Sequence, residues 1–142
     1  MSAENKALYR RYIEEVFNKK NLAFLDENFA PNWVNHHGPA GPETLEEFKQ
    51  RELKTFAAFP DLHITVEDVV AEGDMVTARW TLRGTHKGEF MGIAPTSKQV
   101  TIVGTGYIRL EGGKMVEDWT LHDALGMMQQ LGVVPPPGQA GK

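Results

Sequence analysis

The hydrophobic periodicity changes near Pro60 and Asp61, and this change restricts the chain to a small set of folds. Before this point apolar residues recur at helical spacing, whereas from His63 onward apolar and polar residues alternate. Helices that precede a run of alternating strands are typical of an α+β fold, in which the helices cover one face of a mostly antiparallel sheet. We therefore expect three N-terminal helices, a curved sheet and a short C-terminal helix, arranged as a cone.

The three N-terminal helices are predicted from apolar spacing and capping residues. The first covers residues 2–18, and the second starts at Asn21, a good N-cap, and ends near Phe29. The third covers residues 42–58, where Thr44 and Glu47 resemble a capping box. Its expected buried stripe consists of Leu45, Phe48, Leu53, Phe56 and Phe59.

Strands are predicted over residues 33–37, 63–71 and 75–86, and in a hairpin that begins near Gln99. The hairpin turns at Glu111-Gly112-Gly113-Lys114, because glycine supplies the positive φ that tight turns need. A last helix follows and should end at Gly132. The chain is thus one domain over residues 1–132, followed by a Pro/Gly-rich tail over residues 133–142. A sheet bent around a helix leaves a hollow suited to a small ligand.

Composition and charge exclude several classes of protein. The net charge is -4 without a basic stripe, which argues against nucleic acid as a partner. The chain has no cysteine, which suits a reducing cytoplasm, and its charged N-terminus resembles neither a signal peptide nor a membrane span. His36 and His37 are adjacent and should point to opposite faces of a strand, so we expect no metal site.

Asp123 stands at the junction of the last strand and the last helix. Because side chains alternate along a strand, Trp119, Leu121 and Asp123 should share a face, with Asp123 ~13 Å from Trp119, and His122 should point the other way. An acid at the rim of an apolar surface can have a raised pKa and act as a general base. The alternative is a helix N-cap, which lowers the pKa of an aspartate and makes it a poor base.

Aromatic and basic residues complete the candidate site. Trp80, Tyr107 and Trp119 are by default core aromatics of the sheet, although they would also line a planar ligand. Phe90 lies in a glycine-rich connection, where it would cover the hollow or form a dimer contact. Arg109, if it points inward, has a fork of donors suited to an oxyanion.

Several spaced motifs, in order, resemble the SnoaL-like polyketide cyclases, or ester cyclases, of the nuclear-transport-factor-like cone-fold superfamily. The resemblance extends from about Leu8 to Gly132. The motifs are Val34-Asn35-His36 before a Pro/Gly loop, Phe59-Pro60-Asp61-Leu62, residues 88–96, Gly113-Lys114-Met115-Val116-Glu117-Asp118-Trp119 and Asp123-Ala124-Leu125-Gly126. The chain departs from the family pattern at Ala94, Ser97 and His37.

The resemblance implies a reaction and roles for particular residues. Members of the family close a ring in an aromatic polyketide ester by intramolecular aldol condensation, without a metal or an organic cofactor. The family's acid/base aspartate matches Asp123, and its pocket histidine matches His36 in the motif that also contains Asn35. Polar strand positions of the pocket correspond to Tyr107 and Arg109. The superfamily also suggests a homodimer.

The leading hypothesis is therefore a cofactor-free cyclase that acts on a small apolar carbonyl compound. One alternative is another cone-fold enzyme: an isomerase, a dehydratase, a hydroxylase or an epoxide hydrolase. Epoxide hydrolysis would need an arginine that bridges two aspartates over a bound water, and Arg109 could do this only with Asp123 and another inward acid. The other is a non-catalytic, dimeric binding protein for small ligands. Asp123 facing a closed cavity would favour the enzyme, whereas Asp123 engaged in capping would favour the binding protein.

Overall fold

The computed structural model describes residues 2–36 and 41–135, so His37 and most of the predicted tail lie outside the described residues. The chain folds as an α+β protein, as the sequence predicts. Its elements are α1 (Ser2–Tyr12), the π-helix η1 (Ile13–Asn18), α2 (Ala23–Asn28), β1 (Phe29–His36), β2 (Pro42–Thr44), α3 (Leu45–Ala58), β3 (His63–Glu72), β4 (Met75–Thr85), β5 (Gln99–Glu111), β6 (Lys114–Asp118), β7 (Leu121–His122) and α4 (Ala124–Leu131).

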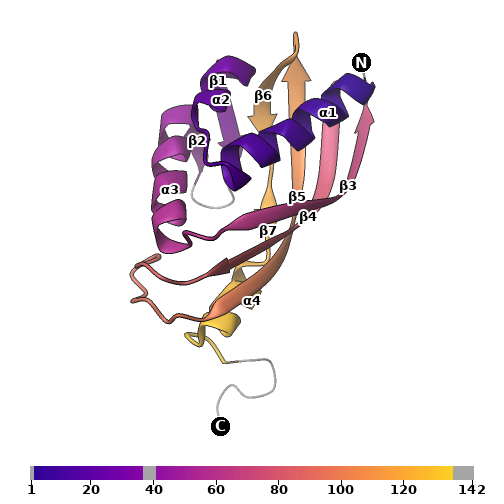
Figure 1. Cartoon of the computed structure of the whole chain (residues 1–142). Helices are drawn as coiled ribbons and strands as arrows, with labels where there is room; N and C mark the ends of the chain where they lie inside the picture. The colour runs from indigo at the N-terminus through magenta and orange to yellow at the C-terminus, as the bar shows by residue number, and fades with distance from the viewer. Residues whose placement is uncertain (1, 37–40, 136–142) are drawn as a thin grey trace.

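The strands form a single sheet with the order β2-β1-β6-β5-β4-β3, and β7 pairs with β5. All pairings are antiparallel except that of β1 with β6, which is parallel. The long strands curve, α1 lies across them, and α3 stands beside β1 and β2 (Figure 1). At the opposite end of the sheet, α4 packs against β5. The helices and the sheet thus enclose the cone that the sequence predicts.

The helix ends follow from local sequence signals. The Thr44 hydroxyl accepts a hydrogen bond from the Glu47 backbone N–H, and the Glu47 carboxylate accepts one from the Thr44 backbone, which confirms the predicted capping box. Gly132 ends α4 with a φ of 84°, a left-handed conformation that glycine adopts without strain. The third helix, α3, begins three residues later than the sequence predicts, because residues 42–44 form β2 instead.

The first helix changes character where it meets the sheet. The sequence predicts one α-helix to Asn18, but the last six residues form a π-helical turn in which the Lys19 N–H donates to the Glu14 carbonyl. The Asn18 side chain then accepts from the Ile64 N–H at 2.8 Å and donates to the Ile64 carbonyl at 3.0 Å. These two bonds attach the end of η1 to β3.

The core lies between the helices and the inner face of the sheet. On β4, Val76, Ala78 and Trp80 are buried, as their alternation predicts. On β5 the inner residues include Ile102 and Ile108, and the residues between them face outward. Among the described residues, every helix is too short or too polar to cross a lipid bilayer.

Candidate functional site

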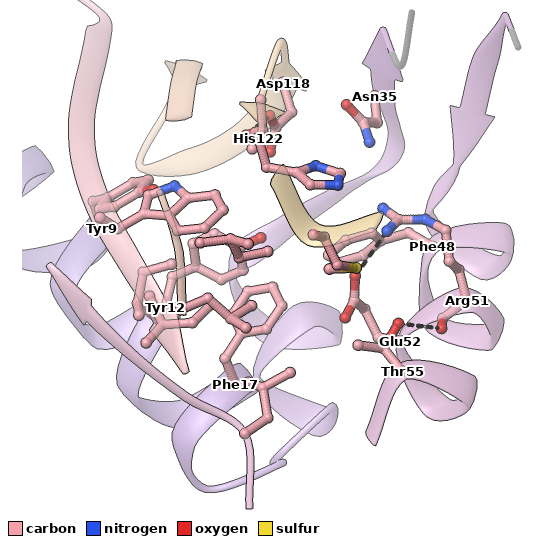
Figure 2. A pocket seen from close by; sticks show the side chains of 18 of the residues that line it. Tyr9, Tyr12, Phe17, Asn35, Phe48, Arg51, Glu52, Thr55, Asp118 and His122 are labelled. Atoms are coloured by element: carbon pink, nitrogen blue, oxygen red, sulfur yellow. Dashed lines mark hydrogen bonds and ion pairs between the residues drawn. The ribbon is translucent and has the colours of Figure 1, made fainter. Parts of the chain in front are cut away.

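A cavity of about 130 Å³ lies between the helices and the inner face of the sheet. Most of its wall is aromatic or aliphatic, with residues from α1, η1, α3, β4 and β5 (Figure 2). Apart from Tyr9 and Tyr12 of α1, its few polar side chains come from β1, α3 and the segment from β6 to β7. An apolar hollow with a small set of polar side chains is the usual form of a small-molecule site.

Asp118 is the acid that the sheet places in this cavity. Its side chain lies at the end of β6, is 3% exposed, and lines the cavity with Thr120 and His122. The Thr120 hydroxyl donates a hydrogen bond to Asp118 Oδ1. Burial raises the pKa of Asp118 from 3.8 to about 6, although the hydrogen bonds from Thr120 and the charge of Arg51 oppose this rise. A carboxylate with such a pKa can accept a proton near neutral pH.

A second buried acid, Glu52, reaches the cavity from α3. Its Oε1 atom lies 3.1 Å from Arg51 Nη1, and burial raises its pKa from 4.5 to about 7 despite the nearby guanidinium. Arg51 also donates to Glu43 through Nε at 2.8 Å and Nη2 at 3.0 Å. One guanidinium therefore contacts two carboxylates beside the cavity, and Figure 2 shows its ion pair with Glu52.

Three of the predicted site residues lie in the cavity wall. Asn35 is buried at the end of β1, Trp80 contributes its ring from β4, and Phe90 covers part of the wall from the loop between β4 and β5. Phe90 also packs edge-on against Phe59, with ring centroids 5.2 Å apart. Substrate binding by these three residues stays a prediction.

Four other predicted residues lie on the outer face of the sheet, away from the cavity. His36 Nε2 is 2.9 Å from Glu117 Oε2, and Arg109 Nε donates to Glu117 Oε1 at 2.7 Å. These hydrogen bonds, His36 first, lower the pKa of Glu117. The Trp119 ring stacks on His36 at 4.9 Å and also contacts Tyr107. The expected inward orientation of Tyr107, Arg109, Trp119 and His36 is therefore corrected.

The expected orientation of Asp123 is corrected as well. Asp123 is exposed, and its Oδ1 accepts a hydrogen bond from the Gly126 N–H at 2.8 Å as the N-cap of α4. Trp119, Leu121 and Asp123 do share a face, as alternation predicts, but this is the outer face. Leu121 is 66% exposed. Capping, the alternative reading of Asp123, is the one that the geometry supports.

A β-bulge in β6 explains why Trp119, Leu121 and Asp123 lie on the outer face of the sheet and not on the inner face. From the turn, Glu111 pairs with Lys114 and Leu110 with Met115, but Arg109 then pairs with Glu117. Val116 is the extra residue of the bulge. One inserted residue moves every later side chain to the opposite face. Asp118 consequently lies opposite the buried Ile108, and Thr120 and His122 follow it into the cavity.

The comparisons with known proteins agree with this fold and cavity. The family model described as "SnoaL-like polyketide cyclase" matches residues 6–131. The chain belongs to this family. No curated protein sequence matches the chain significantly.

Solved structures similar to this SnoaL-like chain carry different descriptions. AclR of Streptomyces galilaeus, described as a proposed hydroxylase, is 29% identical with a TM-score of 0.88, covering 96% of this chain and 89% of its own. IdmH of Streptomyces antibioticus, described as a proposed polyketide cyclase, is 37% identical with a TM-score of 0.79, covering 89% of this chain and 97% of its own. A SnoaL-like protein from Jannaschia sp. CCS1 is 24% identical with a TM-score of 0.86 and coverage of 95% for both chains.

Two cavity acids of this SnoaL-like protein are absent from the sequence-based site. Glu52 had a usable signal, because it lies four residues after Phe48 and four before Phe56, on the buried stripe of α3. Leu53, predicted in that stripe, is 49% exposed instead. Asp118 had no such signal, because its orientation depends on the bulge. Among residues 2–36 and 41–135, no group of three or more His, Asp or Glu side chains is arranged to hold a metal ion.

Proposed function

We propose that the protein catalyses ring closure in a small apolar carbonyl compound, with Asp118 as the general base. The observation that supports this proposal is the buried Asp118 carboxylate at one end of an apolar, aromatic cavity. With a pKa of about 6 Asp118 is still mostly ionised at neutral pH, and the raised pKa makes it a stronger base than an exposed aspartate. Membership in the SnoaL-like polyketide cyclases favours the same type of chemistry.

In the proposed mechanism Asp118 removes a proton from the carbon α to a carbonyl. The electron pair of the broken C–H bond forms an enolate, whose oxygen accepts hydrogen bonds from a donor in the cavity wall, such as Arg51 or His122. Removal of such a donor typically costs about 3 kcal/mol of transition-state stabilisation. The α-carbon then forms a C–C bond to a second carbonyl of the same molecule, and the new alkoxide takes up the proton that Asp118 carries, which restores the base.

The size of the cavity limits the substrate. A volume of about 130 Å³ is smaller than the ~300 to 1,000 Å³ usual for larger ligands. We therefore propose a substrate whose reacting end has one or two rings, with any longer part directed toward the mouth at His122. The exposed side chain of His122 lines this end of the cavity.

The test uses α-tetralone, a bicyclic ketone whose α-hydrogens exchange slowly in neutral D2O, with exchange followed by NMR. The wild-type protein should accelerate exchange, and Asp118→Asn should reduce this acceleration by roughly 10²- to 10⁴-fold, the usual range for a general base. Asp123→Asn tests the residue that the sequence alone selects. The exposed Asp74→Asn is a matched control. Equal exchange in wild type and Asp118→Asn would refute the proposal, and binding of α-tetralone without exchange would support the binding-protein alternative.

A second candidate is epoxide hydrolysis, favoured by one observation. The sequence analysis associates this reaction with an arginine that bridges two aspartates, and here Arg51 contacts two glutamates, Glu43 and Glu52. Arg109, the arginine considered for this role, lies on the outer face. Formation of a diol from styrene oxide, lost in Arg51→Gln, would support this candidate over ring closure.

A further inference from the structure

The amide of Asn35, a residue of the cavity wall, is held in one orientation. Asn35 Nδ2 donates to Glu43 Oε1 at 3.1 Å, and because an ionised carboxylate only accepts, this bond fixes which side of the amide is nitrogen. Asn35 Oδ1 is buried and has no hydrogen-bond partner among the described residues. A buried acceptor without a donor costs about 1 to 3 kcal/mol. A ligand group that reaches this oxygen and donates a hydrogen bond would recover that cost.

Two buried acids on different layers line the same cavity as Asn35. Asp118 on β6 is the neighbour of Asn35 across the parallel β1–β6 pairing. Glu52 reaches the same cavity from α3, and Figure 2 shows the Asp118 and Asn35 side chains at the sheet end with Arg51 and Glu52 on the helix side. A ligand in the cavity thus meets a carboxyl group from each layer.

Glu52 holds a proton more readily than Asp118, because its burial outweighs the opposing charge of Arg51, whereas hydrogen bonds from Thr120 also lower the pKa of Asp118. The groups that face the cavity or its polar edge are Arg51, Glu43, Asp118, Tyr9, Tyr12 and His122. Arg51 is shared with Glu43, so one positive charge serves several carboxyl groups. Burial raises the pKa of Glu52 to about 7 and that of Asp118 to about 6. Two acids whose environments separate their pKa values are suited to opposite roles, one as acid and one as base.

We propose that this cavity also dehydrates a β-hydroxy carbonyl compound, with Asp118 as the base, Glu52 as the acid that protonates the departing hydroxyl, and Asn35 Oδ1 as the acceptor that holds this hydroxyl. The proposal rests on the proposed function, because aldol ring closure produces a β-hydroxy carbonyl compound. The product of the first reaction is then the substrate of the second.

The elimination balances without any further reactant. The α C–H bond breaks and its proton moves to the Asp118 carboxylate, while the electron pair forms a double bond to the β-carbon. The C–O bond at the β-carbon breaks, and the leaving oxygen takes the proton of Glu52 and departs as water. Asp118 is left protonated and Glu52 ionised, and proton exchange with water at the His122 mouth restores both groups.

Two probes separate this reaction from the proposed first function. α-Tetralone has no β-hydroxyl, so its α-hydrogen exchange depends on the base alone. α-Tetralone with a hydroxyl on the β-carbon loses water to give α-naphthol, whose fluorescence reports dehydration. Wild-type protein should accelerate both reactions. Exchange without α-naphthol formation overturns the dehydration proposal and leaves the first function standing, whereas absence of both overturns both.

Variants of Glu52 test its role as the acid. Glu52→Gln should lower the ratio of dehydration to exchange by roughly 100-fold, the usual size of a general-acid contribution, and Glu52→Asp should recover part of it. Asn35→Leu should lower the same ratio, because the β-hydroxyl loses its acceptor. Glu46→Gln, at an exposed position of the same helix, is the matched control and should not change it. An unchanged ratio in Glu52→Gln overturns the proposal.

The pH profile of dehydration distinguishes an acid from a merely structural residue. Dehydration needs Asp118 ionised and Glu52 protonated, so the rate should be highest between about pH 6 and 7 and fall on both sides. Glu52→Gln should remove the fall at high pH, since no proton on residue 52 is then titrated. A high-pH limb that persists in a folded Glu52→Gln protein, verified by its melting curve, overturns the role of Glu52.

Discussion

Burial of Asp118 and Glu52 links the chemistry of the site to the stability of the protein. Both carboxyl groups lose their hydration on folding, so the native protein binds their protons more tightly than the unfolded chain does. Stability must then fall as pH rises, because the unfolded chain gains more from ionising these groups. Groups with a lowered pKa, such as Asp61 and Glu117, titrate at lower pH than Asp118 and Glu52 do in the folded protein.

We expect the free energy of unfolding to decrease between about pH 4.5 and 7. For Glu52 the rise from 4.5 to about 7 corresponds, at about 1.4 kcal/mol for each pH unit, to roughly 3 kcal/mol. Glu52→Gln should therefore flatten the profile and be more stable than wild type at pH 8. Urea unfolding at several pH values measures this, with Glu46→Gln as control. A wild-type profile that is flat or rises over this range would contradict the stated burial effect.

At the residue scale, the sequence predicts which residues share a face of a strand better than it predicts which face points into the cavity. Asn35, Trp80 and Phe90 line the cavity as expected, whereas His36, Tyr107, Arg109, Trp119 and Asp123 do not. Alternation correctly groups the residues of a strand, but it does not say which group faces inward. For Trp119 and Asp123 that choice depended on one extra residue at Val116, and backbone irregularities of this kind leave little trace in the side-chain pattern.

At the scale of elements, the fold depends on where the first helix meets the sheet. Asn18 pairs with both backbone groups of Ile64, which continues the hydrogen bonding of β3 onto a side chain. The preceding π-helical turn contributes Ile13 and Phe17 to the cavity wall. The position of η1 therefore shapes one side of the cavity.

We predict that Asn18→Ala lowers the free energy of unfolding by about 1 to 3 kcal/mol, because the N–H and carbonyl of Ile64 lose their partners in a partly buried place. Urea unfolding at fixed pH measures the change. The exposed Asn21→Ala, which removes a hydrogen bond to Glu15, is the control and should change stability by less than about 0.5 kcal/mol. A loss no larger than that of the control would show that Asn18 does not hold η1 to β3.

Most elements could be predicted from periodicity and capping, as the capping box of α3 and the glycine end of α4 illustrate. The π-helical turn and the strand β2 could not. Both depend on contacts with distant segments: η1 with β3, and β2 with β1. Such tertiary contacts override local preference, and a single sequence does not reveal them.

At the scale of the molecule, the sheet has an apolar outer strip. Val103 and Tyr107 on β5 are exposed, and Leu121 on β7 lies opposite Thr105 between them. Charged residues of both signs, such as the ion-paired Arg79 and Asp68, lie on the same side of the sheet. A face that carries apolar groups with charges of both signs can complement a copy of itself across a two-fold axis. We propose that a second copy of the chain covers this strip, in line with the expected homodimer.

Sedimentation at micromolar concentration should accordingly give the mass of a dimer for the wild-type protein. The double variant Val103→Glu/Leu121→Glu should be monomeric, because paired strips would bring four carboxylates together without water. Leu53→Glu adds a charge at an exposed apolar position of α3 and should remain dimeric. A monomeric wild type, or a dimeric double variant, would rule out this strip as the contact.

The two cavity acids lie on separate layers, one on the sheet and one on a helix, and aromatic side chains separate these layers, as where Phe48 of α3 packs against Trp33 of β1 with ring centroids 5.1 Å apart. The distance between the acid Glu52 and the base Asp118 is thus set by the packing of the helix on the sheet and not by either acid itself. Smaller or larger aromatic side chains between the layers would change the distance between Asp118 and Glu52. This change would alter which pairs of atoms in a ligand the two acids can reach together. New reactions in this fold would then arise from substitutions of apolar residues, with every ionisable group left in place.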